Sequence, residues 1–281
     1  MTQELSGIRV VTLAVNVPGP VAAARLCALG AQVHKIEGPA GDTLRTVTPS
    51  WYDALAQGQT VLTVDLKTDA GRAVFETELD AADVLITAMR PSALHKLGID
   101  AAVAARPALS HVEIVGYDGE RADEAGHDLT YQAAYGMVVP GVMPTVPVVD
   151  LLGAERAVAE VLLALRERDR TGAGAVRRVV LDDAAADAGA AVRHGLLGDG
   201  APLGGADPAY GVYRAADGHV AVAAIEPHFR ARLVTALGAE DHAGIAAAFE
   251  RRSVDEWLEL AARIDVPITE VRGARTAQRS R

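Results

Sequence analysis

One histidine and two carboxylates stand beside predicted helix starts, and their side chains are suited to moving a proton. His127 follows a glycine in Ala-Gly-His-Asp-Leu-Thr-Tyr-Gln-Ala, at the first turn of a predicted helix. Asp150 ends an apolar run, and Glu226 stands in Ala-Ile-Glu-Pro. Proton removal next to a carbonyl needs a base on one face of the carbon, and proton return to the opposite face needs a second acid. The three residues therefore predict an enzyme.

The chemistry around the histidine depends on its neighbours. Histidine is the usual base near neutral pH. A helix N-terminus stabilises an enolate oxygen and favours a neutral imidazole at His127, whereas a carboxylate such as Glu226 favours the charged form. Each residue also has an ordinary alternative, because His127 suits a surface or capping position and both Asp150 and Glu226 suit helix caps.

Composition restricts the class of protein. The 281 residues are enough for one large domain or two unequal ones, and half of them are apolar. A net charge of -10 argues against nucleic acid as a partner. The start of the chain does not resemble a signal peptide, and no apolar run approaches the ~20 residues that span a bilayer, so we expect a cytoplasmic protein without membrane contact.

Two other residue types offer little chemistry. Cys27 is the only cysteine, so no intramolecular disulfide can form, and its apolar surroundings favour a core position over a nucleophile. His34, His111 and His219 lie on predicted strands as ordinary face residues. The other four histidines, His95, His194, His228 and His242, lack carboxylate or cysteine partners at the spacing of metal ligands, so no metal site is expected.

The elements that must position these residues alternate along the chain. Strands are predicted at 8–14, 32–37, 60–66, 84–87, 110–116 and 176–181, and helices at 21–29, 70–82, 92–97 and 151–169. The first helix is expected to follow a Pro18-Gly19-Pro20 turn and to stop at Gly30. This alternation predicts an α/β fold with a doubly wound, mostly parallel sheet.

The domain organisation is predicted from a change in pattern near residue 196. Residues 1–195 form the expected large domain, the Gly-rich stretch 196–206 a linker, and residues 207–281 a small α+β domain with a hairpin turn at Asp217-Gly218. The linker lacks a dinucleotide fingerprint. Ligands of doubly wound sheets bind beyond the carboxyl ends of strands, which makes the loops at 15–20, 38–46, 67–69, 88–91 and before His127 the candidates.

A family resemblance covers nearly the whole chain. The matching segments are Leu-Ser-Gly-Ile-Arg-Val-Val, Pro-Gly-Pro, Leu-Gly-Ala-Gln-Val-His-Lys-Ile-Glu, Thr-Val-Asp-Leu-Lys, Ala-Asp-Val-Leu-Ile, Arg-Pro-Ser-Ala-Leu-His-Lys-Leu-Gly and Val-Pro-Ile-Thr. Together they resemble family III of the coenzyme A transferases. Gly-His-Asp-Leu-Thr-Tyr and Ala-Ile-Glu-Pro-His-Phe are most similar to the α-methylacyl-CoA racemases within it.

The resemblance implies an enzyme that inverts the 2-position of a 2-methyl-branched or other 2-substituted acyl-CoA through an enolate. His127 and Asp150 would be its acid/base pair, with Glu226 orienting or charging His127. Coenzyme A would enter as part of the substrate, with no separate cofactor, and the large domain would bind it. The implied CoA contacts are Lys35, Val64, Asp65, Leu66, Lys67, Arg90, Gly126 and Tyr131. An interlocked homodimer is also implied.

The chain departs from the family pattern at several places. Gly38 stands where an arginine is usual, and Ala-Gln-Gly-Gln-Thr replaces a basic loop, so both differences remove positive charge from the expected phosphate site. Leu-Leu-Gly-Ala-Glu-Arg after Asp150 replaces a glycine run and would crowd the usual acyl pocket. The loop before His127 is short. The match ends at Val-Pro-Ile-Thr without the long C-terminal segment, so we expect a shortened member.

Two alternatives stay open. A family III transferase would use Asp150 as the nucleophile that forms acyl anhydride and thioester intermediates, and it would not need His127. A diverged lyase or a non-catalytic member would reuse the same scaffold, since a fold does not fix a function.

Overall fold

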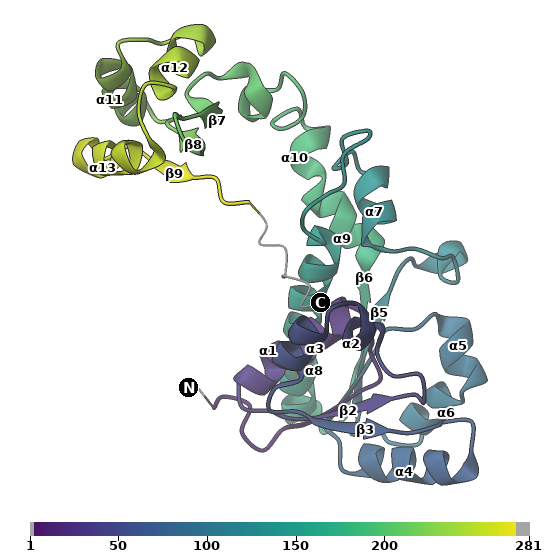
Figure 1. Cartoon of the computed structure of the whole chain (residues 1–281). Helices are drawn as coiled ribbons and strands as arrows, with labels where there is room; N and C mark the ends of the chain where they lie inside the picture. The colour runs from purple at the N-terminus through teal and green to yellow at the C-terminus, as the bar shows by residue number, and fades with distance from the viewer. Residues whose placement is uncertain (1–2, 274–281) are drawn as a thin grey trace. The chain divides into compact units, whose positions relative to one another are not determined.

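The computed structural model describes residues 3–273. Contacts divide the chain between Ala190 and Ala191 into two compact units, whereas the sequence placed the end of the large domain at 195 (Figure 1). The Gly-rich stretch expected as a linker contains one helical turn, Pro202–Ala206. We describe each unit by itself.

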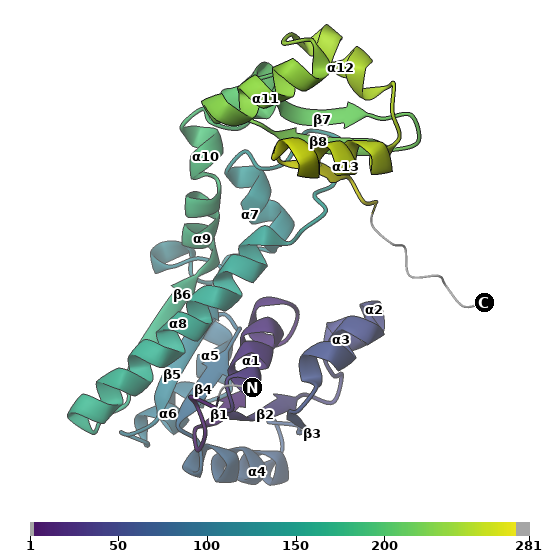
Figure 2. The same cartoon turned by 90° about the vertical axis from the view of Figure 1, so that its left-hand side faces the viewer.

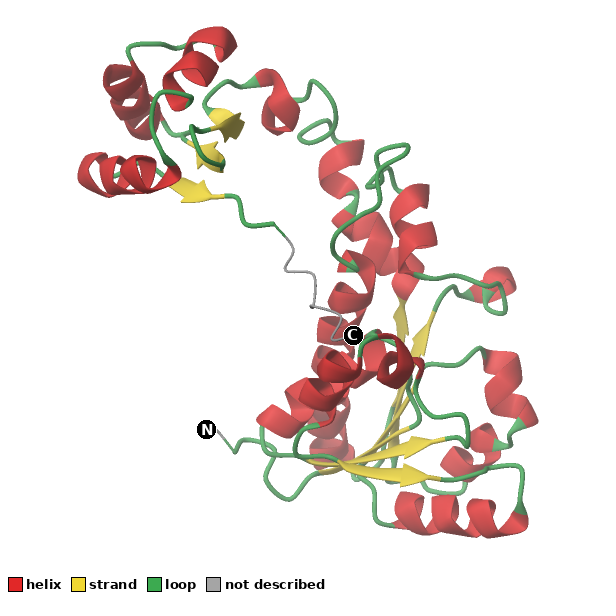
Figure 3. Cartoon of the chain, in the orientation of Figure 1, coloured by secondary structure: helices red, strands yellow, loops and turns green. Residues whose placement is uncertain are grey.

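A parallel sheet organises the first unit. Its described strands are β1 Arg9–Thr12, β2 Gln32–Glu37, β3 Thr60–Thr63, β4 Val84–Thr87, β5 Ser110–Val115 and β6 Val176–Val180. Figure 3 shows the strands of this sheet in yellow. They lie in the order β3-β2-β1-β4-β5-β6, and every pairing is parallel. This arrangement confirms the predicted doubly wound sheet. The strand order reverses between β1 and β4, the place where such sheets bind ligands.

Helices cover both faces of the sheet. The longer ones are α1 Pro18–Ala28, α3 Pro49–Ala56, α4 Asp69–Asp80, α8 Val148–Thr171 and α9 Leu181–Ala188. The shorter ones are α2 Thr43–Val47, α5 Pro91–Lys96, α6 Ile99–Ala104, α7 Asp128–Ala134 and a 3-10 turn at Gly119–Arg121. The short helix α10 Ala190–Arg193 spans the boundary between the two units. Helices α1 and α8 pack side by side over one face, and α4 to α6 cover the other (Figure 2).

The strands are apolar on both faces because each face meets a helical layer. Val10 of β1 joins the core under α1 and α8, and its neighbour Val11 joins the core under α4 to α6. In β4, Ile86 joins the core under α1 and α8, and Leu85 joins the core under α4 to α6. Side chains alternate across a strand, so a strand buried on both sides reads as a continuous apolar run.

Helix α1 begins earlier than predicted. Pro18 and Pro20 lie inside its first turn and do not form a separate turn before it. The first helical N–H groups have no partner within the helix, so a proline there loses no hydrogen bond. The predicted end is confirmed, since Gly30 follows the helix with a φ of 98°.

Helix α8 also begins before its predicted start. It starts at Val148, with Pro147 in the capping position, and ends at Gly172. Asp150 therefore lies in the first turn of the helix and does not precede it as a cap. Its place in the first turn is compatible with the positive end of the helix dipole. Helices α2 and α3 were not predicted, because such short segments carry little periodicity.

The second unit is small and built on an antiparallel sheet. Its strands are β7 Tyr210–Arg214, β8 His219–Ala223 and β9 Ile268–Glu270, and its helices are α11 Pro227–Leu237, α12 His242–Phe249 and α13 Val254–Ile264. Asp217 and Gly218 lie at the turn between β7 and β8, as predicted. Phe249 and Trp257 fill the core, and the Trp257 indole donates a hydrogen bond to the Phe249 carbonyl (2.9 Å). Among the described helices, none has the length and apolarity to cross a bilayer.

The core under α4 gives a stability prediction. Phe75 is fully buried there, so Phe75→Ala should lower the free energy of unfolding by about 3–4 kcal/mol, through lost apolar burial and the cavity that remains. Val74, its neighbour on α4, is 43% exposed, and Val74→Ala should change stability by less than about 0.5 kcal/mol. Urea denaturation of both variants measures the difference. Equal effects would contradict the assigned core.

Candidate active site

A cavity of about 210 Å³ lies at the carboxyl edge of the parallel sheet. Its walls come from Val15 and Asn16 after β1, Met89 and Arg90 after β4, and Gly116 after β5. These positions surround the point where the strand order reverses. The cavity therefore occupies the place where ligands bind in doubly wound sheets.

A second cavity, of about 400 Å³, adjoins the first. Three residues line both cavities: Asn16, His127 and Asp150. The structure thus brings together the histidine and the aspartate that the sequence paired. An imidazole and a carboxyl group border the same space, which is the arrangement that two-sided proton transfer requires.

The loop before α7 fixes His127. Its backbone is extended at the capping position of α7, and its N–H donates to Thr130 Oγ1 (3.0 Å). The Thr130 hydroxyl donates in turn to the His127 carbonyl (2.8 Å). These reciprocal contacts hold the backbone while the His127 side chain stays exposed.

Tyr131 explains the glycine before His127. The ring is buried, and a Cβ built at Gly126 would lie 2.3 Å from the Tyr131 hydroxyl. A Cβ at Gly116 would meet the same oxygen at 2.3 Å. Gly126 is thus required for close packing and not for a left-handed turn, since its φ is not positive. Burial, followed by nearby negative charge and Tyr117, raises the pKa of Tyr131 to about 12, so the phenol stays protonated beside the first cavity.

Asp128 connects the two helices that carry His127 and Asp150. Its Oδ1 accepts the N–H groups of Val149 (2.9 Å) and Asp150 (3.0 Å) at the start of α8. Its Oδ2 accepts from the amide of Gln132, which also donates to the Val146 carbonyl (3.0 Å). Asp128 therefore caps α8 from a neighbouring helix, the task that Pro147 cannot perform.

The same aspartate affects the protonation of Asp150. Burial, and then the negative charge of Asp128, raise the pKa of Asp150 to about 7. A carboxyl group out of water and near a second carboxylate resists ionisation. Asp150 can thus hold or release a proton near neutral pH, as an acid/base residue must.

The residues that the resemblance implies as CoA contacts do not all line the same cavity. Val64, Asp65, Leu66 and Lys67 line a third cavity of about 450 Å³ at the ends of β2 and β3, together with Gly38. This cavity shares Val15 and Met89 with the first one. Arg90, Gly126 and Tyr131 line the first cavity itself. Leu151 and Leu152, which were expected to crowd the acyl pocket, pack against the core.

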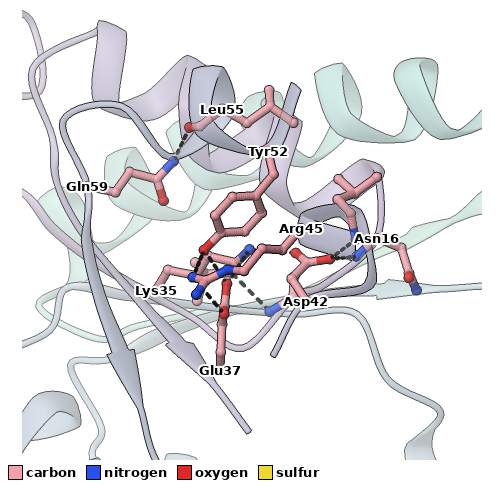
Figure 4. Close-up of polar contacts among 11 residues, drawn as sticks. Asn16, Lys35, Glu37, Asp42, Arg45, Tyr52, Leu55 and Gln59 are labelled. Atoms are coloured by element: carbon pink, nitrogen blue, oxygen red, sulfur yellow. Dashed lines mark hydrogen bonds and ion pairs between the residues drawn. The ribbon is translucent and has the colours of Figure 1, made fainter. Parts of the chain in front are cut away.

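Lys35 does not face any of these cavities. It is 2% exposed, and its ammonium contacts Glu37 Oε1 (2.9 Å) and Asp42 Oδ2 (2.5 Å) (Figure 4). The Tyr52 hydroxyl donates to Glu37 Oε1 (2.7 Å), and Arg45 contacts the same carboxylate (3.3 Å). A buried charge needs such partners, because its desolvation costs several kcal/mol. The position of Lys35 therefore gives it a structural role and does not support the predicted phosphate contact.

Glu226 belongs to the second unit, at the capping position of α11. Its side chain accepts no capping hydrogen bond from that helix. Within residues 3–273, no group of three histidine, cysteine, aspartate or glutamate side chains is placed to hold a metal ion.

Sequence reasoning missed two residues of the site. In the sequence, Asp128 was noted only as part of the motif around His127. An acidic residue at a predicted helix start could have suggested a capping role. Asn16 lay in a candidate loop, and asparagine before a helix start is a known signal for a special backbone conformation.

The raised pKa of Asp150 gives a pH-dependent stability. A pKa raised on folding stabilises the protein below the unfolded pKa of about 4, and that contribution is lost as pH rises through about 7. Asp150→Asn cannot ionise, so its stability relative to the parent chain should increase by about 2 kcal/mol between pH 5 and pH 8. Urea unfolding across that range measures it.

Asp169→Asn is the matched control, since Asp169 is an exposed carboxylate on the same helix. Its stability relative to the parent should not vary with pH in this way. A flat difference for Asp150→Asn as well would show that Asp150 has an ordinary pKa.

Comparison with known proteins places this site in context. The chain is 28% identical to a probable fatty acyl-CoA transferase of Mycobacterium tuberculosis over 95% of its own length and 77% of that protein. It is 31% identical to the alpha-methylacyl-CoA racemase of Homo sapiens, over 91% of this chain and 69% of that protein. A crystal structure of a CAIB/BAIF family protein from Brucella suis matches with a TM-score of 0.80 and 25% identity, covering 97% of this chain and 85% of that one.

The family match extends through both units. The sequence pattern of CoA-transferase family III covers residues 5–281. The relatives include enzymes named for racemisation and for acyl-CoA transfer. The chain belongs to CoA-transferase family III.

Proposed function

We propose that the protein is a racemase or epimerase of a 2-methyl-branched or other 2-substituted acyl-CoA. The observation that carries this proposal is the shared lining of two joined cavities by His127 and Asp150, one of them an acid with a pKa raised to about 7. Inversion of a carbon next to a thioester requires two acid/base groups that reach it from different sides.

The reaction would proceed in two proton transfers. The His127 imidazole takes the α-proton, and the electron pair of the C–H bond moves into the thioester to form an enolate. Asp150 in its acid form then returns a proton to the opposite face of the carbon. In the reverse direction the Asp150 carboxylate removes the proton and the imidazolium supplies one. A pKa near 7 populates both forms of Asp150, which a reversible reaction needs.

The third cavity is suited to the nucleotide end of coenzyme A. It meets the first cavity at Val15 and Met89, so a ligand could extend from one into the other. Lys67 and Arg90 are exposed, one in each cavity, and carry positive charge for phosphate groups. With Lys35 occupied by carboxylates, we propose that Lys67 and Arg90 supply the main phosphate contacts.

A CoA transferase is the second candidate, favoured by the name of the mycobacterial relative. Its mechanism would need Asp150 as an ionised nucleophile that attacks a thioester. Burial beside Asp128 works against ionisation at neutral pH and therefore against this use of the side chain. The same environment suits proton transfer, so racemisation is preferred.

Two further parts of the proposal come from the family resemblance. One is a homodimer, which analytical ultracentrifugation tests. The other is the pairing of Glu226 with His127. The supporting observation is that the Glu226 carboxylate makes no capping hydrogen bond with α11.

Exchange with solvent tests the proposed chemistry. Incubation of a 2-methylacyl-CoA with the protein in deuterated water should place deuterium at the 2-position and should convert either enantiomer into a mixture. Mass spectrometry and chiral chromatography measure the two effects. Absence of exchange across a panel of 2-substituted thioesters would refute the racemase.

His127→Ala separates the two candidates. It removes one of the two proton-transfer groups, so interconversion of the enantiomers should fall at least about 100-fold, the usual contribution of a general base. The Asp150 carboxylate can still exchange the α-proton of one enantiomer. A transferase would keep its activity with a CoA donor and a free acid. His95→Ala is the control, because His95 is 88% exposed and lies outside the cavities described above. Interconversion of the enantiomers at the parental rate in His127→Ala would contradict the role of His127, and transfer of CoA that survives in this variant would favour the transferase.

A further inference from the structure

Asn16 occupies the junction of the first and second cavities. It lines both of them, a property that it shares only with His127 and Asp150 among the residues of these two walls. An acyl group positioned between the imidazole and the carboxyl group would thus have its reacting carbon beside Asn16. The thioester carbonyl is bonded directly to that carbon, so its oxygen lies in the same region.

The backbone of Asn16 has an unusual conformation that is held in place. Its φ is 70°, and Asp265 is the only other described residue besides glycine with a positive φ. The Asn16 N–H donates to Asp42 Oδ1 (3.1 Å), which also accepts the N–H of Leu44 (3.0 Å). The other oxygen of Asp42 contacts the buried ammonium of Lys35 (2.5 Å). The buried ion cluster of Lys35, Glu37 and Asp42 therefore fixes the backbone from which the Asn16 side chain projects.

The side-chain amide of Asn16 points away from this cluster (Figure 4). It makes no hydrogen bond with any residue of the described range 3–273, although the residue is half-buried. A carboxamide has two N–H donors and a carbonyl acceptor. Asn16 lines the first and second cavities, so these groups are available to bind a polar atom of a ligand there.

We propose that the Asn16 amide donates a hydrogen bond to the carbonyl oxygen of the thioester and stabilises the enolate that forms there. The proposal rests on the proposed function of the site. When the α-proton leaves, the electron pair of the C–H bond delocalises onto that oxygen, and a fixed donor stabilises the growing negative charge. Asn16 would be a third catalytic residue, beside His127 and Asp150.

Asparagine also tolerates the left-handed conformation better than most residues, so the backbone alone could account for its presence. Asp265, in the second unit, also adopts a left-handed backbone conformation. The test must therefore change the amide and keep the conformation. Asn16→Gly and Asn16→Asp both do so, because glycine adopts positive φ freely and aspartate resembles asparagine in size and backbone preference.

A pair of ligands isolates the hydrogen bond without relying on catalysis. One is 2-methylbutyryl-CoA, and the other is the thioether in which a methylene replaces its carbonyl. The parent chain should bind the thioester roughly three to ten times more tightly than the thioether, as one hydrogen bond allows. Asn16→Gly should lose this preference, and Asn16→Asp should reverse it by placing an acceptor against the carbonyl oxygen. Calorimetry measures all six affinities.

Exchange at the 2-position supplies the second readout. In Asn16→Gly, kcat should fall about 100-fold with a smaller change in KM, the pattern of a lost enolate donor. Asp265→Gly, which changes the other left-handed residue, should exchange at the parental rate. A parental ligand preference and kcat in Asn16→Gly would overturn the proposal. A parent chain that shows the ligand preference without exchange would refute the racemase and keep the hydrogen bond.

Discussion

One oxygen of Asp128 accepts two backbone N–H groups at the start of α8, and the site depends on this interaction. His127 precedes Asp128 in the chain, and Asp150 supplies one of the two N–H groups, so a few covalent and hydrogen bonds connect the two residues of the proposed acid/base pair. The same carboxylate contributes to the raised pKa of Asp150. Asp128 thus helps to fix the position of Asp150 and adds to the effect of burial on its protonation.

The parallel sheet determines where this pair can act. Strands buried on both faces leave only their ends open to solvent, and the carboxyl ends of β1, β4 and β5 form the wall of the first cavity. Adjacent strand ends at β2 and β3 form the third cavity, where an elongated ligand has room beside the reacting group. The core thereby provides rigidity, and the loops provide the chemistry.

The sequence was informative where a pattern is local. Apolar runs predicted all six parallel strands, and Gly30 marked the end of α1 through its left-handed backbone. Prediction was poor where a contact joins distant segments. The burial of Lys35 by Asp42 and the capping of α8 by Asp128 depend on tertiary packing, which single residues do not encode. The proximity of His127 and Asp150 was expected from the family resemblance, and no spacing rule would have given it.

The buried cluster of Lys35, Glu37 and Asp42 constrains how this sequence can drift. Loss of Lys35 leaves two buried carboxylates without the ammonium that both of them contact, which costs several kcal/mol. Mutational paths that replace Lys35 therefore have to change the two carboxylates as well, or pass through poorly folded intermediates. Because Asp42 also holds the loop before α1, such paths would disturb the proposed active site at the same time as the fold. Selection for activity and selection for foldedness act there on the same three codons.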